Sequence, residues 1–239
     1  MNTPTNQPRH ALLLVGSAKK EHESTSEALG HYLLEQLAVQ GFTSETIHVQ
    51  RALRTPDRTS EFLALVDAAD LFVLAFPVYV DNLPYLVTRA LEQIAEHRQS
   101  QPNPRRAGFL AIANCGFPEA QHCKTALDIC AVFAQQAHFE WRGGLALGEG
   151  GMVAGRALAE QGGSLKTVRQ ALEMTAAALA KNEHAPQQAI DLLAKPLIPF
   201  RLYTSVATVG WHLTSWQNGA HQQLHAQPLH RNFREDSRS

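Results

Sequence analysis

The stretch ALLLVGSAKKEHESTSEALGHYLLEQL, residues 11–37, decides the fold of this chain. Its first five residues are apolar and end at Gly16, a pattern typical of a parallel strand that is buried on both faces. Leu29, Leu33 and Leu37 then recur every four residues, which predicts a helix with one apolar face. A buried strand that leads directly into an amphipathic helix indicates an α/β fold.

The turn between this strand and this helix is a candidate anion site. It carries Ser17, Lys19 and a run of hydroxyl side chains over residues 24–26. Unpaired N–H groups and the positive end of the helix dipole favour an anion at such a turn, and a phosphate is the obvious ligand. The same residues also fit a simpler role, a capping box in which Ser24 caps the helix and Glu27 bonds back. Both interpretations stay open from the sequence.

Two common nucleotide motifs are missing from the turn. No Gly-Lys-Ser/Thr follows Gly16, so hydrolysis of a nucleoside triphosphate at a Walker A loop is not supported. Gly16 also stands alone, so a Rossmann dinucleotide site in this turn is not expected.

The alternation of strand and helix continues along the chain. Further strands are predicted at 46–49, 71–76, 108–113 and 141–147, with helices at 61–67, 86–97 and 119–137 and an exposed connection over 51–60. Parallel strands need helical crossovers, so this alternation predicts an α/β fold with a doubly wound, five-stranded parallel sheet.

The last third of the chain lies outside this unit. An alanine-rich helix is predicted at 158–181, a second helical piece at 187–194, and a segment rich in aromatic residues at 200–216. We expect a flexible N-terminus over 1–9, a cofactor-binding domain over 10–157, a helical C-terminal extension over 158–230 and a frayed end over 231–239. The aromatic residues of the extension must be buried on the domain, on a second subunit or on a membrane surface.

Composition narrows the choice of partner and compartment. A net charge of -1 gives no reason to expect nucleic acid as a partner. No run approaches the roughly 20 apolar residues of a membrane-spanning helix, and the polar start lacks the apolar core of a signal peptide, so a cytoplasmic protein is expected. Cys115, Cys123 and Cys130 lack the spacing of a metal-ligand pair, and their odd number argues against a disulfide framework. We therefore expect no metal site.

Several unusual loops each follow a predicted strand. They span 16–26, 77–84 and 114–119, and a fourth spans 148–151. Ligands of open parallel sheets bind beyond the carboxyl ends of the strands. Because all four loops lie at that edge, we expect them to form a single site.

Two of these loops carry a resemblance to a known family. The turn Gly16-Ser17-Ala18-Lys19 with the hydroxyls of residues 24–26, and the sequence PVYVDNLP at 77–84, resemble the flavodoxin-like superfamily, specifically its NAD(P)H-dependent FMN reductase branch. Alanine and lysine stand where these reductases commonly have proline and arginine in the first turn. The resemblance covers about residues 11–151.

The resemblance implies a flavodoxin-like fold, FMN as cofactor and NAD(P)H as electron donor. It implies an oxidoreductase that passes electrons to a quinone, a flavin or a similar small acceptor, and we expect a homodimer. The chemistry would take place on the flavin, so no catalytic side chain is predicted. The cofactor-binding residues that it implies are Ser17, Lys19, Ser24, Thr25, Ser26, Pro77, Val78, Tyr79, Val80, Asp81, Asn82, Asn114, Cys115, Gly116 and Phe117.

Simpler roles for several of these residues remain open. Pro77 can end a strand, and Asp81 or Asn82 can cap the next helix. Cys115 is either a redox-reactive thiol or a residue small enough for its space.

Two other functions also remain open. A flavodoxin-type carrier would pass single electrons to a protein partner, but such carriers are usually strongly acidic, and a net charge of -1 counts against one. An interaction protein without flavin would use its aromatic C-terminal segment to bind a partner or a membrane.

Overall fold

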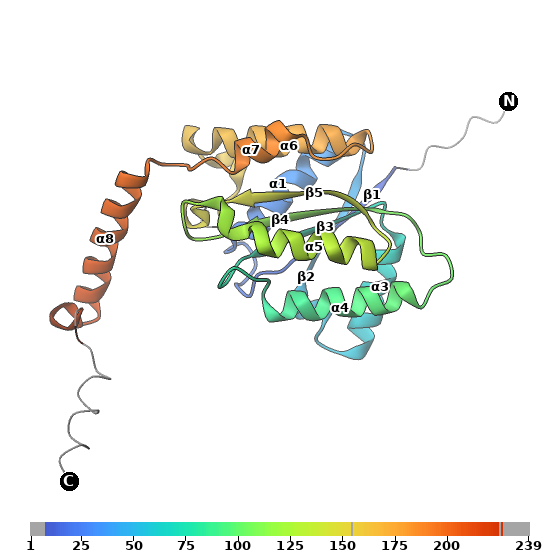
Figure 1. Ribbon diagram of the computed structural model, residues 1–239, viewed down its shortest axis with the longest axis horizontal. Helices are drawn as coiled ribbons and strands as arrows, with labels where there is room; N and C mark the ends of the chain where they lie inside the picture. Colours follow the sequence, from blue (N-terminus) through green and yellow to red (C-terminus); the bar gives the residue numbers. More distant parts are fainter. Residues whose placement is uncertain (1–7, 154, 225, 227–239) are drawn as a thin grey trace, which may run out of the picture. The chain divides into compact units, whose positions relative to one another are not determined.

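A computed structural model describes residues 8–153, 155–224 and 226 of the chain. The chain divides into two compact units, the first ending at Leu197 and the second beginning at Ile198. The first unit contains a five-stranded parallel sheet in the order β2-β1-β3-β4-β5 (Figure 1). Its strands are β1 (His10–Val15), β2 (Thr43–His48), β3 (Leu71–Pro77), β4 (Gly108–Asn114) and β5 (Glu140–Leu147). The predicted doubly wound parallel sheet is confirmed, with the strand order of the flavodoxin-like fold.

The strand register brings the carboxyl ends of the strands together. Val15 at the end of β1 pairs with Ala75 in β3, and Pro77 at the end of β3 pairs with Asn114 at the end of β4. Asn114 in turn pairs with Leu147, the last residue of β5. The loops that follow these strands therefore begin at one edge of the sheet.

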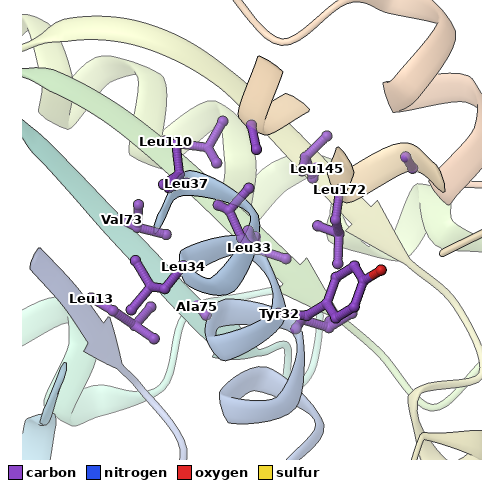
Figure 2. Packing of buried hydrophobic residues seen from close by; sticks show 14 of the residues in the cluster. Leu13, Tyr32, Leu33, Leu34, Leu37, Val73, Ala75, Leu110, Leu145 and Leu172 are labelled. Atoms are coloured by element: carbon purple, nitrogen blue, oxygen red, sulfur yellow. The ribbon is translucent and has the colours of Figure 1, made fainter. Parts of the chain in front are cut away.

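One face of the sheet is covered by α1 (Thr25–Val39), α6 (Lys166–Ala180) and α7 (Gln187–Leu193) (Figure 1). The predicted apolar face of α1 is confirmed, since Leu33 and Leu37 are fully buried against the sheet. Figure 2 shows them near Leu110 of β4, with Leu172 of α6 on the same face. Helix α6 thus contributes to the core of the first unit, although its sequence was expected to form part of a C-terminal extension.

The opposite face is covered by α2 (Val49–Ala52), α3 (Pro56–Ala68), α4 (Tyr85–Gln99) and α5 (Lys124–Gln136), with the short 3₁₀ turn η1 (Ala120–Cys123) leading into α5. An aromatic cluster fills the space between sheet and helices. The ring of Phe109 stacks on Phe72 at a centroid distance of 5.4 Å and meets Phe133 edge to face at 5.2 Å.

The connection expected over 51–60 is mostly exposed, but much of it is helical. Helix α2 extends to Ala52, and α3 begins at Pro56. Thr55 caps α3, since its side chain accepts a hydrogen bond from the N–H of Arg58. The first N–H groups of a helix have no carbonyl partner within the helix, so a proline, which lacks an N–H, loses no hydrogen bond there. Pro56 therefore suits the start of α3.

The predicted helix over 158–181 begins later than expected. Two 3₁₀ turns, η3 (Leu158–Glu160) and η4 (Gly163–Leu165), precede α6, which begins at Lys166. Gly162 lies between the two turns and Gly163 begins the second, and glycine disfavours a continuous helix because of its backbone entropy.

The second unit contains α8 (Phe200–Gln217) and the 3₁₀ turn η5 (His221–Gln223). Its large apolar side chains Val209, Trp211, Leu213 and Trp216 are exposed. Among the described residues, none of the helices is long and apolar enough to cross a membrane.

A buried arginine joins three segments at the edge of the sheet opposite the site loops. Arg98 of α4 is fully buried, and its Nε donates to the carbonyl of Ala137 at 2.7 Å. Its other nitrogens donate to the carbonyl of Arg105 at 2.6 Å and to Asp67 at 3.1 Å. The guanidinium lies 4.1 Å from the ring centroid of Phe139.

We predict that Arg98→Met lowers the free energy of unfolding by about 3 kcal/mol, because two carbonyls and a carboxylate lose their charged donor. Urea unfolding followed by circular dichroism measures the change. Arg89→Met, at an exposed arginine of the same helix, is the matched control and should change stability by less than about 0.5 kcal/mol. Equal losses in the two variants would contradict the role assigned to Arg98.

Candidate functional site

The turn after β1 is held by the start of α1. The Oγ of Ser24 accepts a hydrogen bond from the N–H of Glu27 at 3.0 Å, which confirms Ser24 as the helix cap. Glu27 does not complete a capping box, because its carboxylate accepts from the N–H of His22 at 2.7 Å. The carboxylate of Glu27 therefore bonds to an N–H two residues before that of Ser24, the partner that a capping box predicts.

Buried hydroxyls of α1 tie its first turn to two other loops. The hydroxyl of Thr25 donates to the carbonyl of Gly150 at 2.6 Å. The side-chain amide of Asn114 donates to the Oγ of Ser26 at 2.7 Å and to the carbonyl of Phe76 at 3.0 Å. These contacts link the loops after β1, β3, β4 and β5, which the sequence predicted to form a single site.

The remaining polar residues of the first turn differ in their exposure to solvent. The Oγ of Ser17 accepts a hydrogen bond from the N–H of Lys19 at 3.2 Å. Ser17 is buried, whereas Lys19 and Lys20 are exposed. The first N–H groups of a helix have no carbonyl partner within it, so the start of α1 combines donors, a dipole and two cations.

Sequence reasoning gave Glu27 a place in the capping box but missed the partners of its buried carboxylate. It lies 3.6 Å from Nε2 of His48, the last residue of β2, and 3.7 Å from Nδ1 of His22. A salt bridge between Arg51 and Glu21 links this turn to α2 as well. The acidic residue at the third helical position was visible in the sequence, but its partners depend on the packing of β2 beside β1.

The loop after β3 forms a tight turn. Tyr79 and Asn82 each donate a backbone hydrogen bond to the other's carbonyl at 3.2 Å. Between them Val80 and Asp81 have φ values of 52° and 57°, the left-handed pair that defines a type I′ turn. Tyr79 is 56% exposed and Val80 97% exposed. A β-branched residue at positive φ is strained, and such strain gathers at functional sites.

We predict that Val80→Asn raises the free energy of unfolding by about 1 kcal/mol, because asparagine tolerates the left-handed conformation that strains valine. Thermal and urea unfolding measure the gain. Val132→Asn, at an exposed valine within α5, is the control and should give no gain. A loss of stability in Val80→Asn would show that the turn conformation is not strained.

The loop after β4 forms the second exposed wall. A Cβ placed on Gly116 would meet no heavy atom within 4 Å, so space is open beside it. Phe117 is 60% exposed, and its ring centroid lies 5.0 Å from that of His122. Nδ1 of His122 lies 3.2 Å from Oδ1 of Asp81, so this histidine joins the two exposed loops. No motif in the sequence pointed to His122.

The three thiols are buried. The Sγ of Cys115 lies 3.5 Å from the carbonyl oxygen of Phe117. Interaction with the thiol of Cys123 lowers the pKa of Cys115 to about 7 against the opposing effect of burial. The same interaction and burial raise the pKa of Cys123, and burial alone raises the pKa of Cys130 to about 12.

The loop after β5 covers the start of α1. A Cβ on Gly148 would lie 2.4 Å from the carbonyl oxygen of Pro118, and one on Gly155 would lie 2.4 Å from the backbone of Glu23. Gly155 also has a φ of 73°, so this position favours glycine. Glu149 donates its N–H to the carbonyl of Phe117 at 2.8 Å. These close approaches hold the loop against the loop after β4 and against Glu23, which directly precedes the hydroxyl run of residues 24–26.

A cavity of about 620 Å³ lies beside α1, away from the exposed loop residues Tyr79 and Phe117. Its lining includes Glu27, His31 and Tyr32 from α1. Burial lowers the pKa of His31, and burial with a hydrogen bond to Glu173 raises the pKa of Tyr32 to about 12. Sequence reasoning did not point to this cavity.

The residues present fit FMN. Exposed Tyr79, Val80 and Phe117 offer apolar surface to a flat ring, and the space beside Gly116 admits its edge. The start of α1 with Lys19 suits a phosphate. Among the described residues, His, Cys, Asp and Glu side chains form no group of three or more that could hold a metal ion.

Comparison with known proteins agrees with this site. Residues 10–117 match the family described as NADPH-dependent FMN reductase. A search of curated proteins found no match. Similar solved structures include an NADH:FMN oxidoreductase in its apo form, with 16% identity and a TM-score of 0.52 over 82% of this chain and 98% of that one.

Two further structures share the fold. A flavodoxin from Streptococcus pneumonia TIGR4 is 14% identical, with a TM-score of 0.50 over 72% of this chain and 98% of that one. A flavone reductase is 14% identical, with a TM-score of 0.54 over 74% of this chain and 65% of that one. At such identities these likenesses show the fold alone. Residues 10–117, which carry β1 to β4 and the loops after β1 and β3, are therefore similar to NADPH-dependent FMN reductases, and the fold is flavodoxin-like. This similarity supports an oxidoreductase of the NAD(P)H-dependent FMN reductase kind, with FMN as cofactor and NAD(P)H as electron donor.

Proposed function

We propose that this protein passes electrons from NAD(P)H to a small acceptor, either a quinone or a free flavin. When bound, FMN takes a hydride from the nicotinamide and passes electrons to the acceptor. The observation that carries the proposal is the pair of exposed loops after β3 and β4, which His122 and Asp81 join beside the start of α1. Their apolar residues support binding of a planar ring and exclude water from one of its faces.

At the phosphate end, the proposed residues divide into two groups. Lys19, Ser17 and the first N–H groups of α1 would contact the phosphate, because Lys19 carries an exposed positive charge in the turn that leads into α1 and the helix start offers N–H donors. Ser24, Thr25 and Ser26 are engaged as a cap and as links to Gly150 and Asn114, so they would hold the shape of the turn.

At the ring end, Tyr79 and Val80 would face the isoalloxazine, while Asp81 would hold the loop through His122. The other residues proposed for this end would offer backbone N–H and carbonyl groups to the ring or let the backbone pass close to it. They are Pro77, Val78, Asn82, Asn114, Cys115, Gly116 and Phe117. Val80, at the tip of the turn after β3, is almost fully exposed. This exposure supports the proposal that a small acceptor reaches the ring from solvent.

Absorbance spectroscopy of the purified protein tests this function. The protein is mixed with FMN, freed of excess and titrated with NADH or NADPH without oxygen, after which a quinone or free flavin is added. Retained flavin that a nicotinamide bleaches, and that either acceptor restores, is the expected result. Retained flavin that neither nicotinamide bleaches would indicate an electron carrier, and failure to retain FMN would reject both functions.

We predict that Tyr79→Ala weakens FMN binding by up to about tenfold, because a stacked aromatic ring contributes about 1 kcal/mol. Quenching of FMN fluorescence measures the dissociation constant. Tyr85→Ala is the control, since Tyr85 is also exposed and its hydroxyl accepts a hydrogen bond from Arg89 of the same helix. An equal effect of the two substitutions would count against a ring contact at Tyr79.

We also propose that the protein forms a homodimer and acts in the cytoplasm. The exposed apolar side chains of α8 support a protein partner, since large exposed apolar patches mark interaction sites. Cys115, Cys123 and Cys130 are free thiols, which supports a reducing compartment. Light scattering should give twice the 26.3 kDa of one chain. A monomer that binds lipid vesicles would instead place the apolar side chains of α8 on a membrane surface.

A further inference from the structure

The stretch between Ser17 and Ser24 carries part of the proposed phosphate contact, yet it has little packing of its own. Residues 18–23 are all exposed, whereas Ser17 before them and Ser24 after them are buried. A phosphate needs its N–H donors and its cation at fixed places. Contacts from residues inside the fold must therefore set the shape of this exposed stretch.

The backbone of His22 is the strained point of the stretch. Its φ is 65°, in the left-handed region that residues other than glycine seldom adopt. Such a conformation persists only where neighbouring contacts hold it. Here the contact comes from Glu27, whose Oε2 accepts a hydrogen bond from the N–H of His22 at 2.7 Å. Glu27 thus fixes a backbone atom within the exposed stretch.

The carboxylate of Glu27 is itself held in place. Its side chain is only 4% exposed, and its Oε1 lies 3.6 Å from Nε2 of His48 at the end of β2. The N–H of Glu27 donates to the Oγ of Ser24 at 3.0 Å, so the main chain of the same residue is tied to the helix cap. A buried carboxylate that is fixed in this way imposes one position on the N–H that it accepts from.

A second contact reaches the same stretch but holds it less firmly. Arg51 of α2 lies 2.6 Å from a carboxylate oxygen of Glu21. Both side chains are largely open to solvent, and exposed ion pairs contribute little to stability because water and salt screen them. The buried contact between Glu27 and His22 is therefore the stronger of the two.

The charge of Glu27 would by itself work against a bound phosphate. Glu27 is the third residue of α1, close to the positive end of the helix dipole. A carboxylate there repels a second anion, so an electrostatic role in phosphate binding does not account for it. Its hydrogen bond to the backbone of His22 does.

We propose that Glu27 is a positioning residue for the phosphate of FMN. By accepting the N–H of His22, it holds residues 18–23 so that Lys19 and the first N–H groups of α1 can contact the same phosphate. The inference rests on the proposed function, because it concerns the cofactor assigned there. It adds a specificity, since Glu27 secures the phosphate and not the ring. Glu27 therefore favours FMN over riboflavin, which has the same ring and no phosphate.

Fluorescence titrations of the full chain with FMN and with riboflavin test the proposal. Glu27→Ala removes the acceptor and should weaken FMN binding by about tenfold, while riboflavin binding changes by less than about twofold. Riboflavin binding also reports that the variant is folded. Glu27→Gln keeps an oxygen that can accept from the N–H of His22, and it should bind FMN within about threefold of the wild-type chain. Glu35→Ala, at an exposed glutamate of the same helix, is the matched control and should change neither dissociation constant.

Amide hydrogen exchange of the protein without flavin gives an independent readout. In Glu27→Ala the N–H of His22 should exchange at least about tenfold faster than in the wild-type chain, because it has lost its acceptor. In Glu27→Gln and in Glu35→Ala its exchange should stay close to the wild-type rate. An N–H of His22 that exchanges equally fast in all four proteins would show that Glu27 does not hold this stretch.

Two results of the titrations would overturn the proposal and leave the proposed function intact. If Glu27→Ala weakens the binding of FMN and of riboflavin alike, Glu27 supports the fold and not the phosphate contact. If Glu27→Gln loses as much affinity for FMN as Glu27→Ala, the charge matters and the hydrogen bond does not. A wild-type chain that binds neither flavin would instead overturn the proposed function and this inference together.

Discussion

The side-chain amide of Asn114 joins three elements at the carboxyl edge of the sheet. It donates to the hydroxyl of Ser26 at the start of α1 and to the carbonyl of Phe76 near the end of β3, while its own backbone ends β4. A buried amide left without these partners would cost about 1–3 kcal/mol, so the three elements are held in one arrangement. The loops that form the site start from these fixed points, and their relative positions follow from this contact.

Around that contact, polar links between loops replace the regular hydrogen bonds of the sheet. Thr25 reaches Gly150, Glu27 lies beside His48 and His122 reaches Asp81, and each contact joins segments that belong to different strands or turns. The buried links fix the base of the site, whereas the exposed one joins the two loops that hold its apolar residues. Such a site, with a base fixed by buried contacts and two exposed loops above it, suits a bound cofactor. The cofactor is held in place while the electron donor and the acceptor bind in turn at its solvent-exposed side.

The hydroxyl run of residues 24–26 shows how a sequence signal and its role can differ. Hydroxyls before a helix predicted a phosphate contact, and in the structure they act as a cap and as links to Gly150 and Asn114. The two roles are connected, because the donors of the helix start can meet an anion only if the turn keeps its shape. His122 shows the opposite case, since no motif in the sequence pointed to it and its contact with Asp81 comes from the folded loops.

The sequence by itself determined the sheet, its helices and the edge where the site lies. Apolar runs such as 11–15 and 71–76 predict strands from neighbouring residues alone. All strands of a parallel sheet point the same way, so their carboxyl ends meet at one edge however the side chains pack. Only the tertiary structure decided the contacts of His48 and His122, since each partner lies on another segment of the chain. It also decided that α6 and α7 belong to the first unit, because an amphipathic helix shows which side it buries but not the surface that receives it.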